Sequence, residues 1–66
     1  MPILTIATTV LSNLPALIKA GMDVMALINS TNAVIAKAQA SGTDPTDSDW
    51  ATLDQMLTDL RAQAQA

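Results

Sequence analysis

The apolar residues in the first two thirds of the chain follow a helical period. From Ile3 to Ala38 they recur at alternating spacings of three and four residues, nearly without interruption. This period is that of one face of an α-helix. The row consists of Ile3, Ala7, Val10, Leu14, Leu17, Gly21, Val24, Ile28, Thr31, Ile35 and Ala38. The sequence therefore predicts one long helix over about residues 3–40.

A second apolar row runs beside the first. Its members lie seven residues apart and are Leu4, Leu11, Ile18 and Met25. Together with Ile6, Met22 and Leu27, the two rows make a stripe wider than the ~100° that a helix packed on a single neighbour requires. One partner helix would therefore leave part of the stripe uncovered.

Two residues interrupt the long segment. Pro15 removes a backbone hydrogen bond and clashes with the carbonyl of Leu11, which predicts either a kink or a break at residues 12–15. Gly21 lies on the first apolar row, where a missing side chain weakens the helix but lets another backbone approach closely.

The sequence leaves more than one structural role open for the polar residues on the long segment. The stretch NSTN, residues 29–32, either places Thr31 or Asn32 in a helix contact that sets register, or forms a local turn or an exposed face. Asp23 follows Lys19 by four residues, a spacing that predicts a weak ion pair on the helix surface.

A shorter helix is predicted to follow a loop at residues 41–46. Gly42 suits the left-handed position just past a helix end, and Pro45 cannot continue a helix. Thr46 is the predicted N-cap, and Asp49, three residues later, completes an acidic version of the capping box. A calcium loop starting at Asp44 would need glycine and glutamate at its sixth and twelfth places, where the chain has other residues.

The apolar residues of the shorter helix, predicted over residues 47–64, form a narrow seam. Its members are Trp50, Leu53, Leu57, Leu60 and Ala64. We expect the first four to pack against the long helix within the chain, because a seam of this width fits a single neighbour.

The small size of the chain argues for partners. A domain of 66 residues buries only about 60% of the surface that its unfolded form exposes. The sequence has no cysteine for a disulfide and no cysteine or histidine for a structural zinc, so association is the remaining way to add stability. We expect a single all-α domain over residues 1–66, a helical hairpin completed by oligomerisation.

The uncovered side of the long helix is the predicted interaction surface, because large exposed apolar patches usually mark interfaces. We place on it Ile3, Val10, Leu14, Leu17, Ile18, Gly21, Val24, Met25, Ile28 and Ile35.

The residue types leave little scope for catalysis. The chain has no His, Cys, Tyr or Glu, so the usual general bases and thiol nucleophiles reduce to aspartate. It has no glycine-rich phosphate loop and no nucleophile elbow. We predict no catalytic residue, no cofactor and no metal. Lys19, Lys37 and Arg61 are far apart, which argues against nucleic-acid binding.

A membrane location is a weaker alternative. Residues 1–18 carry no charged side chain, but a signal peptide would need a positive segment before its apolar core. A span would need about 20 predominantly apolar residues, whereas this stretch contains threonine, serine, asparagine and proline.

One segment resembles known proteins. The stretch SGTDPTDSDWATLDQMLTDLRAQ, residues 41–63, resembles the C-terminal part of small uncharacterised helical proteins of tailed bacteriophages and prophages. The matching residues are Gly42, Asp44, Pro45, Thr46, Asp49 and Trp50, with Asp49 standing where glutamate is more usual. The resemblance implies a phage particle, its assembly or phage lysis as the setting, and hence the virion or the host cytoplasm as the location.

These observations favour a non-enzymatic, self-associating structural or assembly protein, present as a homo-oligomer or within a larger phage assembly. One alternative is a holin-like lysis protein in which residues 2–28 insert into the bilayer or lie in it. Another is a small adaptor or inhibitor that docks its apolar face on one larger protein, as a helix docks in a groove.

Overall fold

The chain is all-α, as predicted. The computed structural model describes residues 2–65, which form three helices and no strand: α1 (Ile3–Lys19), α2 (Met25–Ser41) and α3 (Asp47–Gln65). The first and last residues of the predicted 1–66 domain lie outside the described residues.

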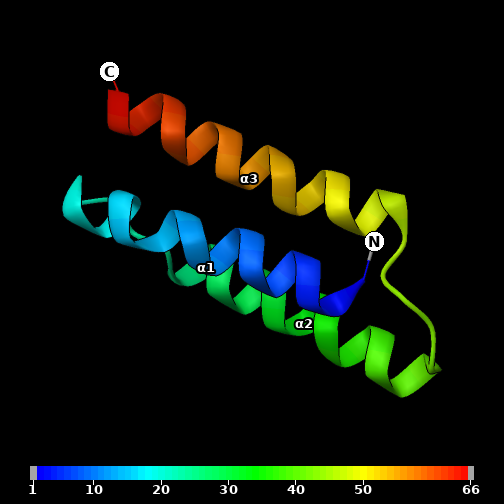
Figure 1. Ribbon diagram of the computed structural model, residues 1–66. Helices are drawn as coiled ribbons and strands as arrows, with labels where there is room; N and C mark the ends of the chain where they lie inside the picture. Colours follow the sequence, from blue (N-terminus) through cyan, green and yellow to red (C-terminus); the bar gives the residue numbers. More distant parts are fainter. Residues whose placement is uncertain (1, 66) are drawn as a thin grey trace.

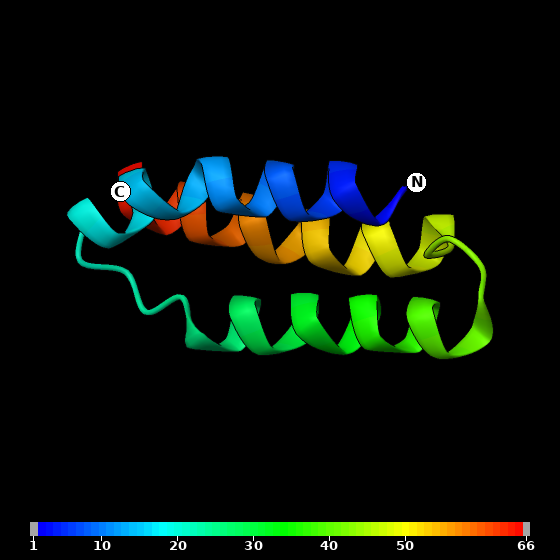
Figure 2. The same cartoon turned by 60° about the horizontal axis from the view of Figure 1, so that its bottom comes forward.

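The three helices lie side by side as an elongated bundle (Figure 1). Helices α1 and α3 run in the same direction, and α2, which comes between them in the sequence, runs in the opposite direction. Each helix contacts the other two. The Cα atoms extend over 39 × 17 × 17 Å. Figure 2 shows the bundle turned so that α2 lies below α1 and α3, with one connecting loop at each end of the bundle.

The long helix expected over residues 3–40 is divided into α1 and α2, and the division falls at residues 20–24, not at residues 12–15. Gly21 adopts a left-handed conformation with φ of 82°. Its N–H donates to the carbonyl of Ile18 at 3.0 Å, and the N–H of Met22 donates to the carbonyl of Leu17 at 3.0 Å. These two bonds make a Schellman motif, which ends α1 and reverses the chain.

Pro15 lies inside α1, which continues through it to Lys19. The polar residues just before it do not cap a new helix. Instead, Ser12 Oγ and Asn13 Nδ2 donate to the carbonyl of Thr9 at 2.9 and 2.7 Å, one helical turn back. Pro15 is exposed and has no backbone N–H to donate to the Leu11 carbonyl.

The loop between α1 and α2 gives Asp23 a different role from the predicted ion pair. Because α1 ends at Lys19, Lys19 and Asp23 no longer share a helix face. Asp23 Oδ1 accepts the N–H of Met25 at 3.0 Å, at the first turn of α2. The carboxylate therefore satisfies one of the free donors at the start of that helix.

The core lies along the axis between the three helices. Its buried members are Ile6, Val10, Leu17, Val24, Leu27, Leu53 and Leu57. Thr31 is the buried polar residue, and its Oγ1 donates to the carbonyl of Leu27 at 2.8 Å. Because this hydroxyl is satisfied within its own helix, Thr31 can be buried without a partner from another helix.

Helix α3 begins with reciprocal hydrogen bonds between Thr46 and Asp49. The N–H of Asp49 donates to Thr46 Oγ1 at 3.1 Å, and the N–H of Thr46 donates to Asp49 Oδ2 at 3.1 Å. Just upstream, Gly42 ends α2 with φ of 71°. The loop thus stops one helix and starts the next within a few residues, which places α3 against the first two helices.

Candidate interaction surface

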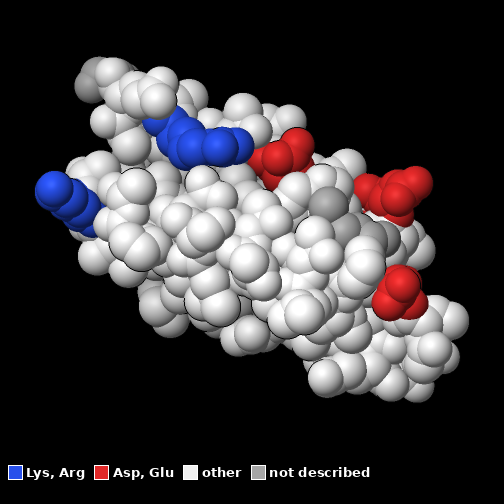
Figure 3. Space-filling view, viewed as in Figure 1, with Lys and Arg blue, Asp and Glu red and all other residues white. Residues whose placement is uncertain are grey.

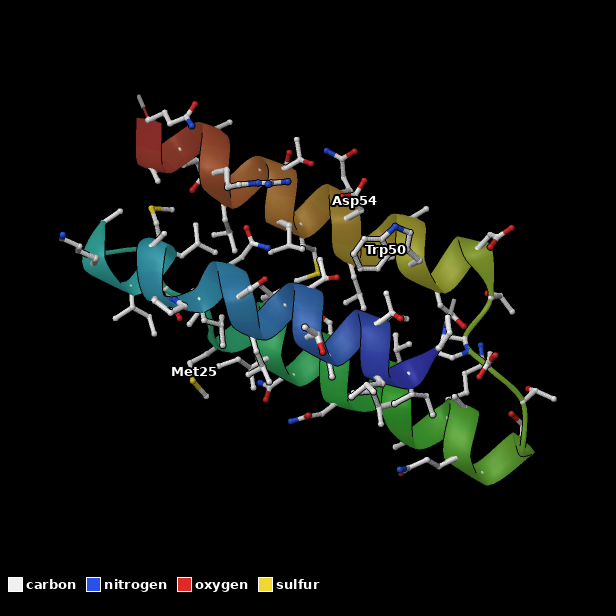
Figure 4. All side chains as sticks on the ribbon, viewed as in Figure 1. Met25, Trp50 and Asp54 are labelled. Carbon is white, nitrogen blue, oxygen red and sulfur yellow. The ribbon has the colours of Figure 1, made fainter. Side chains whose placement is uncertain are left out.

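Four large apolar side chains remain exposed on the bundle. Leu4 is 77% exposed, Leu11 63%, Ile18 59% and Met25 58%. They are the members of the second apolar row of the sequence, three of them on α1 and the last at the first position of α2. We call them the outer row. In Figure 4 the Met25 side chain points away from the other helices.

A shallow groove of about 130 Å³ lies beside the outer row, between α1 and α2. Its lining residues are Ala7, Val10, Leu11, Leu14, Ile28, Thr31, Asn32 and Ile35. The first four come from α1 and the others from α2, so α3 takes no part in it. We call it the α1/α2 groove. All but two of its lining residues are apolar, the exceptions being Thr31 and Asn32.

The predicted interface residues divide into three groups. Val10, Leu17 and Val24 are buried in the core of the chain, because α2 and α3 together cover the first apolar row. Ile3, Leu14, Ile28 and Ile35 are half-buried, while Ile18 and Met25 are exposed. Gly21 lies exposed in the loop between α1 and α2, where it ends α1 and does not bring two helices into close contact.

The predicted interface residues did not include Leu4, Leu11 or Asn32, although all three are exposed on α1 and α2. The spacing carried a usable signal. Leu4, Leu11 and Ile18 keep a strict seven-residue repeat, the period of a helix seam that faces another helix in a coiled coil. A row with that period beside a second, complete row indicates a second packing surface.

The residues predicted to pack α3 within the chain lie on its inner side. Leu53 and Leu57 are buried, and Trp50 and Leu60 are half-buried and pack against the core. In Figure 4 the Trp50 ring lies between α3 and α1, while Asp54 points away from both other helices. Helix α3 therefore covers one side of the α1–α2 pair and leaves the α1/α2 groove on another.

Charge is distributed unevenly over the bundle (Figure 3). Residues 3–18 and 24–36, which make up nearly all of α1 and most of α2, carry no charged side chain. The aspartates of residues 44–49 gather at the end where α3 begins, and Lys19 and Arg61 lie toward the opposite end. The members of the outer row and the residues that line the groove therefore lie in two segments without charged side chains.

The start of α3 carries Asp49, whose pKa is lowered. The N–H and hydroxyl of Thr46 hold the pKa of Asp49 below its usual value, and Lys37, whose Nζ lies 3.5 Å from Asp49 Oδ1, acts in the same direction. The Lys37 side chain is 70% exposed, so this ion pair contributes little stability. Within residues 2–65 the acidic side chains form no group that could hold a metal ion.

Among residues 2–65, the structure contains no helix with both the length and the apolar character needed to cross a membrane. Comparison of the chain with protein-family models, with curated proteins and with solved structures finds no match. The exposed apolar side of α1 and α2 is thus the feature from which a function has to be argued.

Proposed function

We propose that this chain is a non-enzymatic helical assembly protein that associates with itself through the outer row and the α1/α2 groove. The observation that carries the proposal is the outer row: four large apolar side chains, each more than half exposed, on a chain of 66 residues. Isolated exposed leucines are common on protein surfaces, but an aligned row beside an apolar groove is typical of an interface.

The free energy available from the outer row is substantial for so small a domain. Fully burying a leucine or isoleucine contributes about 1.5–3 kcal/mol, so four side chains that are mostly exposed retain roughly 4–8 kcal/mol per copy. Two copies that cover each other gain about twice this amount, against an association cost of about 4–15 kcal/mol. The row by itself supports weak association, and filling the groove adds to it.

The setting we propose is a bacteriophage particle or its assembly. This part of the proposal is supported by the resemblance of residues 41–63 to small proteins of tailed phages. A protein that occurs in many copies within a particle meets high local concentration, and under those conditions a weak interface is sufficient.

Sedimentation of the purified chain over a range of concentrations tests the proposal. We expect the average mass to rise with concentration in the micromolar range. Leu11→Gln, which places an amide at the centre of the outer row, should remain monomeric while unfolding at the same urea concentration as the wild type. Thr58→Gln, on the exposed side of α3, is the matched control and should associate normally. A wild-type chain that stays monomeric at every concentration would refute self-association.

A lipid surface is the rival occupant of the same apolar side, because residues 1–18 carry no charge. Interfacial helices usually carry Lys and Arg for anionic lipids, and α1 has only Lys19. Flotation with vesicles that contain anionic lipid separates the two ideas. We expect the protein to remain in the aqueous fraction, and co-flotation that Leu11→Gln abolishes would favour the membrane-active alternative.

A further inference from the structure

We infer that two copies of this chain pair face to face about a two-fold axis that crosses the helices at the level of Leu11 and Asn32. The inference rests on the proposed self-association and specifies its geometry: α1 packs antiparallel on α1 of the second copy, and α2 packs antiparallel on α2. The four helices would enclose a new apolar layer, with α3 of each copy on the outside.

The three members of the outer row on α1 have the symmetry that such an axis needs. Leu4 and Ile18 each lie seven residues from Leu11, which is about 10.5 Å along a helix. An axis through Leu11 therefore places Leu4 of one copy on Ile18 of the second copy and pairs the two Leu11 side chains. A two-fold interface requires this kind of self-complementary patch.

Helix α2 has the same symmetry about the same level. Asn32 and Leu11 both line the α1/α2 groove, each near the middle of the lining stretch of its helix, residues 28–35 and 7–14, so the two residues lie at a similar height on these antiparallel helices. Ile28 and Ile35 flank Asn32 at distances of four and three residues. The crossing axis thus brings Ile28 of one copy to Ile35 of the other, and brings the two Asn32 amides together.

Pairing of the two Asn32 side chains would give the amide of this apolar surface a hydrogen-bond partner. An amide carries both donors and acceptors, so two copies related by symmetry can hydrogen-bond to each other. A buried asparagine pair at the seam between helices favours one register over its neighbours, since any shift leaves an amide against apolar side chains. Asn32 would therefore specify the alignment that Leu11 stabilises.

Two copies could also pair face to face about a two-fold axis that runs parallel to the helices, but Leu11 and Asn32 disfavour this arrangement. That axis would place α1 of one copy on α2 of the other, so that Leu11 would meet Asn32. Each amide would then face a leucine and not a second amide. Burial of a polar group without a hydrogen-bond partner is unfavourable, whereas the crossing axis pairs apolar with apolar and amide with amide.

The charges at the two ends of the bundle favour the crossing axis as well. The end where α3 begins carries Asp44, Asp47 and Asp49 against Lys37 alone, while Lys19 and Arg61 balance two aspartates toward the other end (Figure 3). The crossing axis brings the Lys19 end of one copy to the acidic end of the other. An axis along the bundle would instead set the two acidic ends side by side, and like charges that meet across an interface disfavour the pairing.

The size of the surface fits a dimer of modest affinity. A side of the bundle measuring 39 by 17 Å offers each copy about 650 Å², so two copies would bury on the order of 1,300 Å², at the lower end of the range for stable interfaces. An interface of this size is compatible with a dimer that dissociates on dilution.

Disulfide trapping in the full chain tests the axis, and it is straightforward because the sequence has no cysteine. A disulfide forms only when the two Cα atoms lie within about 4.4–6.8 Å, so it reports local pairing. We expect an equimolar mixture of Leu4→Cys and Ile18→Cys to give the mixed dimer in several-fold excess over either self-linked product. Leu11→Cys should link to itself, and Thr58→Cys, on the exposed side of α3, should not.

The other outcomes separate this inference from the self-association on which it rests. If the wild type dimerises but Leu4→Cys links mainly to itself, or Ile18→Cys links mainly to Met25→Cys, the crossing axis is wrong and self-association stands. The axis is equally wrong if the wild type dimerises and none of these positions links. If the wild type sediments as a monomer at every concentration, both ideas fall. Asn32→Leu, which should still dimerise, is expected to lose the excess of the mixed product.

Discussion

Helix α3 and the α1–α2 pair differ in how much of their apolar surface is covered within the chain. Helix α3 has one narrow seam, its inner members are buried, and its outer side carries aspartates and Arg61. Helix α1 has two apolar rows, of which the inner one is buried or half-buried and the outer one is exposed. A helix with one row needs one groove to pack into, whereas a helix with two rows needs a further partner once its own chain has covered the first.

The two regions also differ in how their helices begin. Helix α3 has a Thr46–Asp49 capping box and acidic residues in its first turn. Helices α1 and α2 start without a side-chain cap at the N-cap residue and without an acid in the first turn. The start of α3 therefore has a reciprocal pair of side-chain hydrogen bonds, whereas the start of α2 has the single bond from the Met25 N–H to Asp23 Oδ1.

Truncation of a leucine in each region gives the largest expected difference. Leu53→Ala opens a cavity at a fully buried site and should lower the free energy of unfolding by about 3 kcal/mol. Leu11→Ala removes a side chain that is mostly exposed in the monomer, and should change the free energy of unfolding by less than about 0.5 kcal/mol. Urea unfolding at low protein concentration measures both, and equal losses would contradict the assignment of an inner and an outer row.

Replacement of the two helix-ending glycines should have an intermediate effect. Gly21 and Gly42 have φ of 82° and 71°, and nothing lies within 4 Å of a Cβ added at either. The cost of Gly21→Ala therefore comes from the left-handed backbone alone, and we expect a loss of roughly 1–2 kcal/mol in unfolding free energy. Gly42→Ala is the matched variant and should lose a similar amount.

The sign of the Gly21→Ala effect distinguishes the bundle from a continuous helix. In a helix that ran unbroken through residues 3–40, the same change would stabilise the chain by about 1 kcal/mol, because alanine is the better helix former. Thermal unfolding of Gly21→Ala and Gly42→Ala, followed by circular dichroism, is sufficient. A gain at Gly21 with a loss at Gly42 would be evidence against the loop at residues 20–24.

Acid should weaken the start of α3 more than the start of α1, and this is the smallest of the expected effects. The pKa of Asp49 is lowered in the folded chain by the Thr46 hydrogen bonds. A lowered pKa contributes stability that is fully present above the unfolded pKa of about 3.9 and is lost as pH falls through the folded value. Hydrogen exchange of the first α3 amides should therefore speed up below about pH 4, relative to that of α1.

Asp49→Asn is the control for the pH effect. The asparagine cannot ionise, so the step in α3 protection over this pH range should shrink in the variant while α1 behaves as in the wild type. An unchanged step would show that Asp49 is not the source of the acid sensitivity.

Local residues identify α3 well. Gly42, Pro45, Thr46 and Asp49 mark a helix end, a break and a new start within eight positions, and each acts through neighbours in its own turn. The predicted helix over residues 47–64 differs from α3 only at its final residue. The seam of Trp50, Leu53 and Leu57 likewise follows from spacing alone.

The break at residues 20–24 could not be predicted from local residues in the same way. Gly21 continues the apolar period on both sides, and glycine is compatible with a helix interior as well as with a left-handed end. Pro15 was the more obvious candidate for a break, yet it lies within α1. The period of the side chains is the same whether the segment is one helix or two, so the spacing could not locate the turn.

The sequence by itself determined the helical class, the limits of α3 and the presence of two apolar rows on the first segment, because propensity, capping and periodicity act over a few residues. Only the tertiary structure decided that the segment folds back at Gly21 and which row is covered. That choice depends on Leu17 and Leu27 packing with Leu53 and Leu57 in one core, and contacts between residues so far apart in the chain leave no local pattern. The row left outside, with Leu11 at its centre, is a product of that choice.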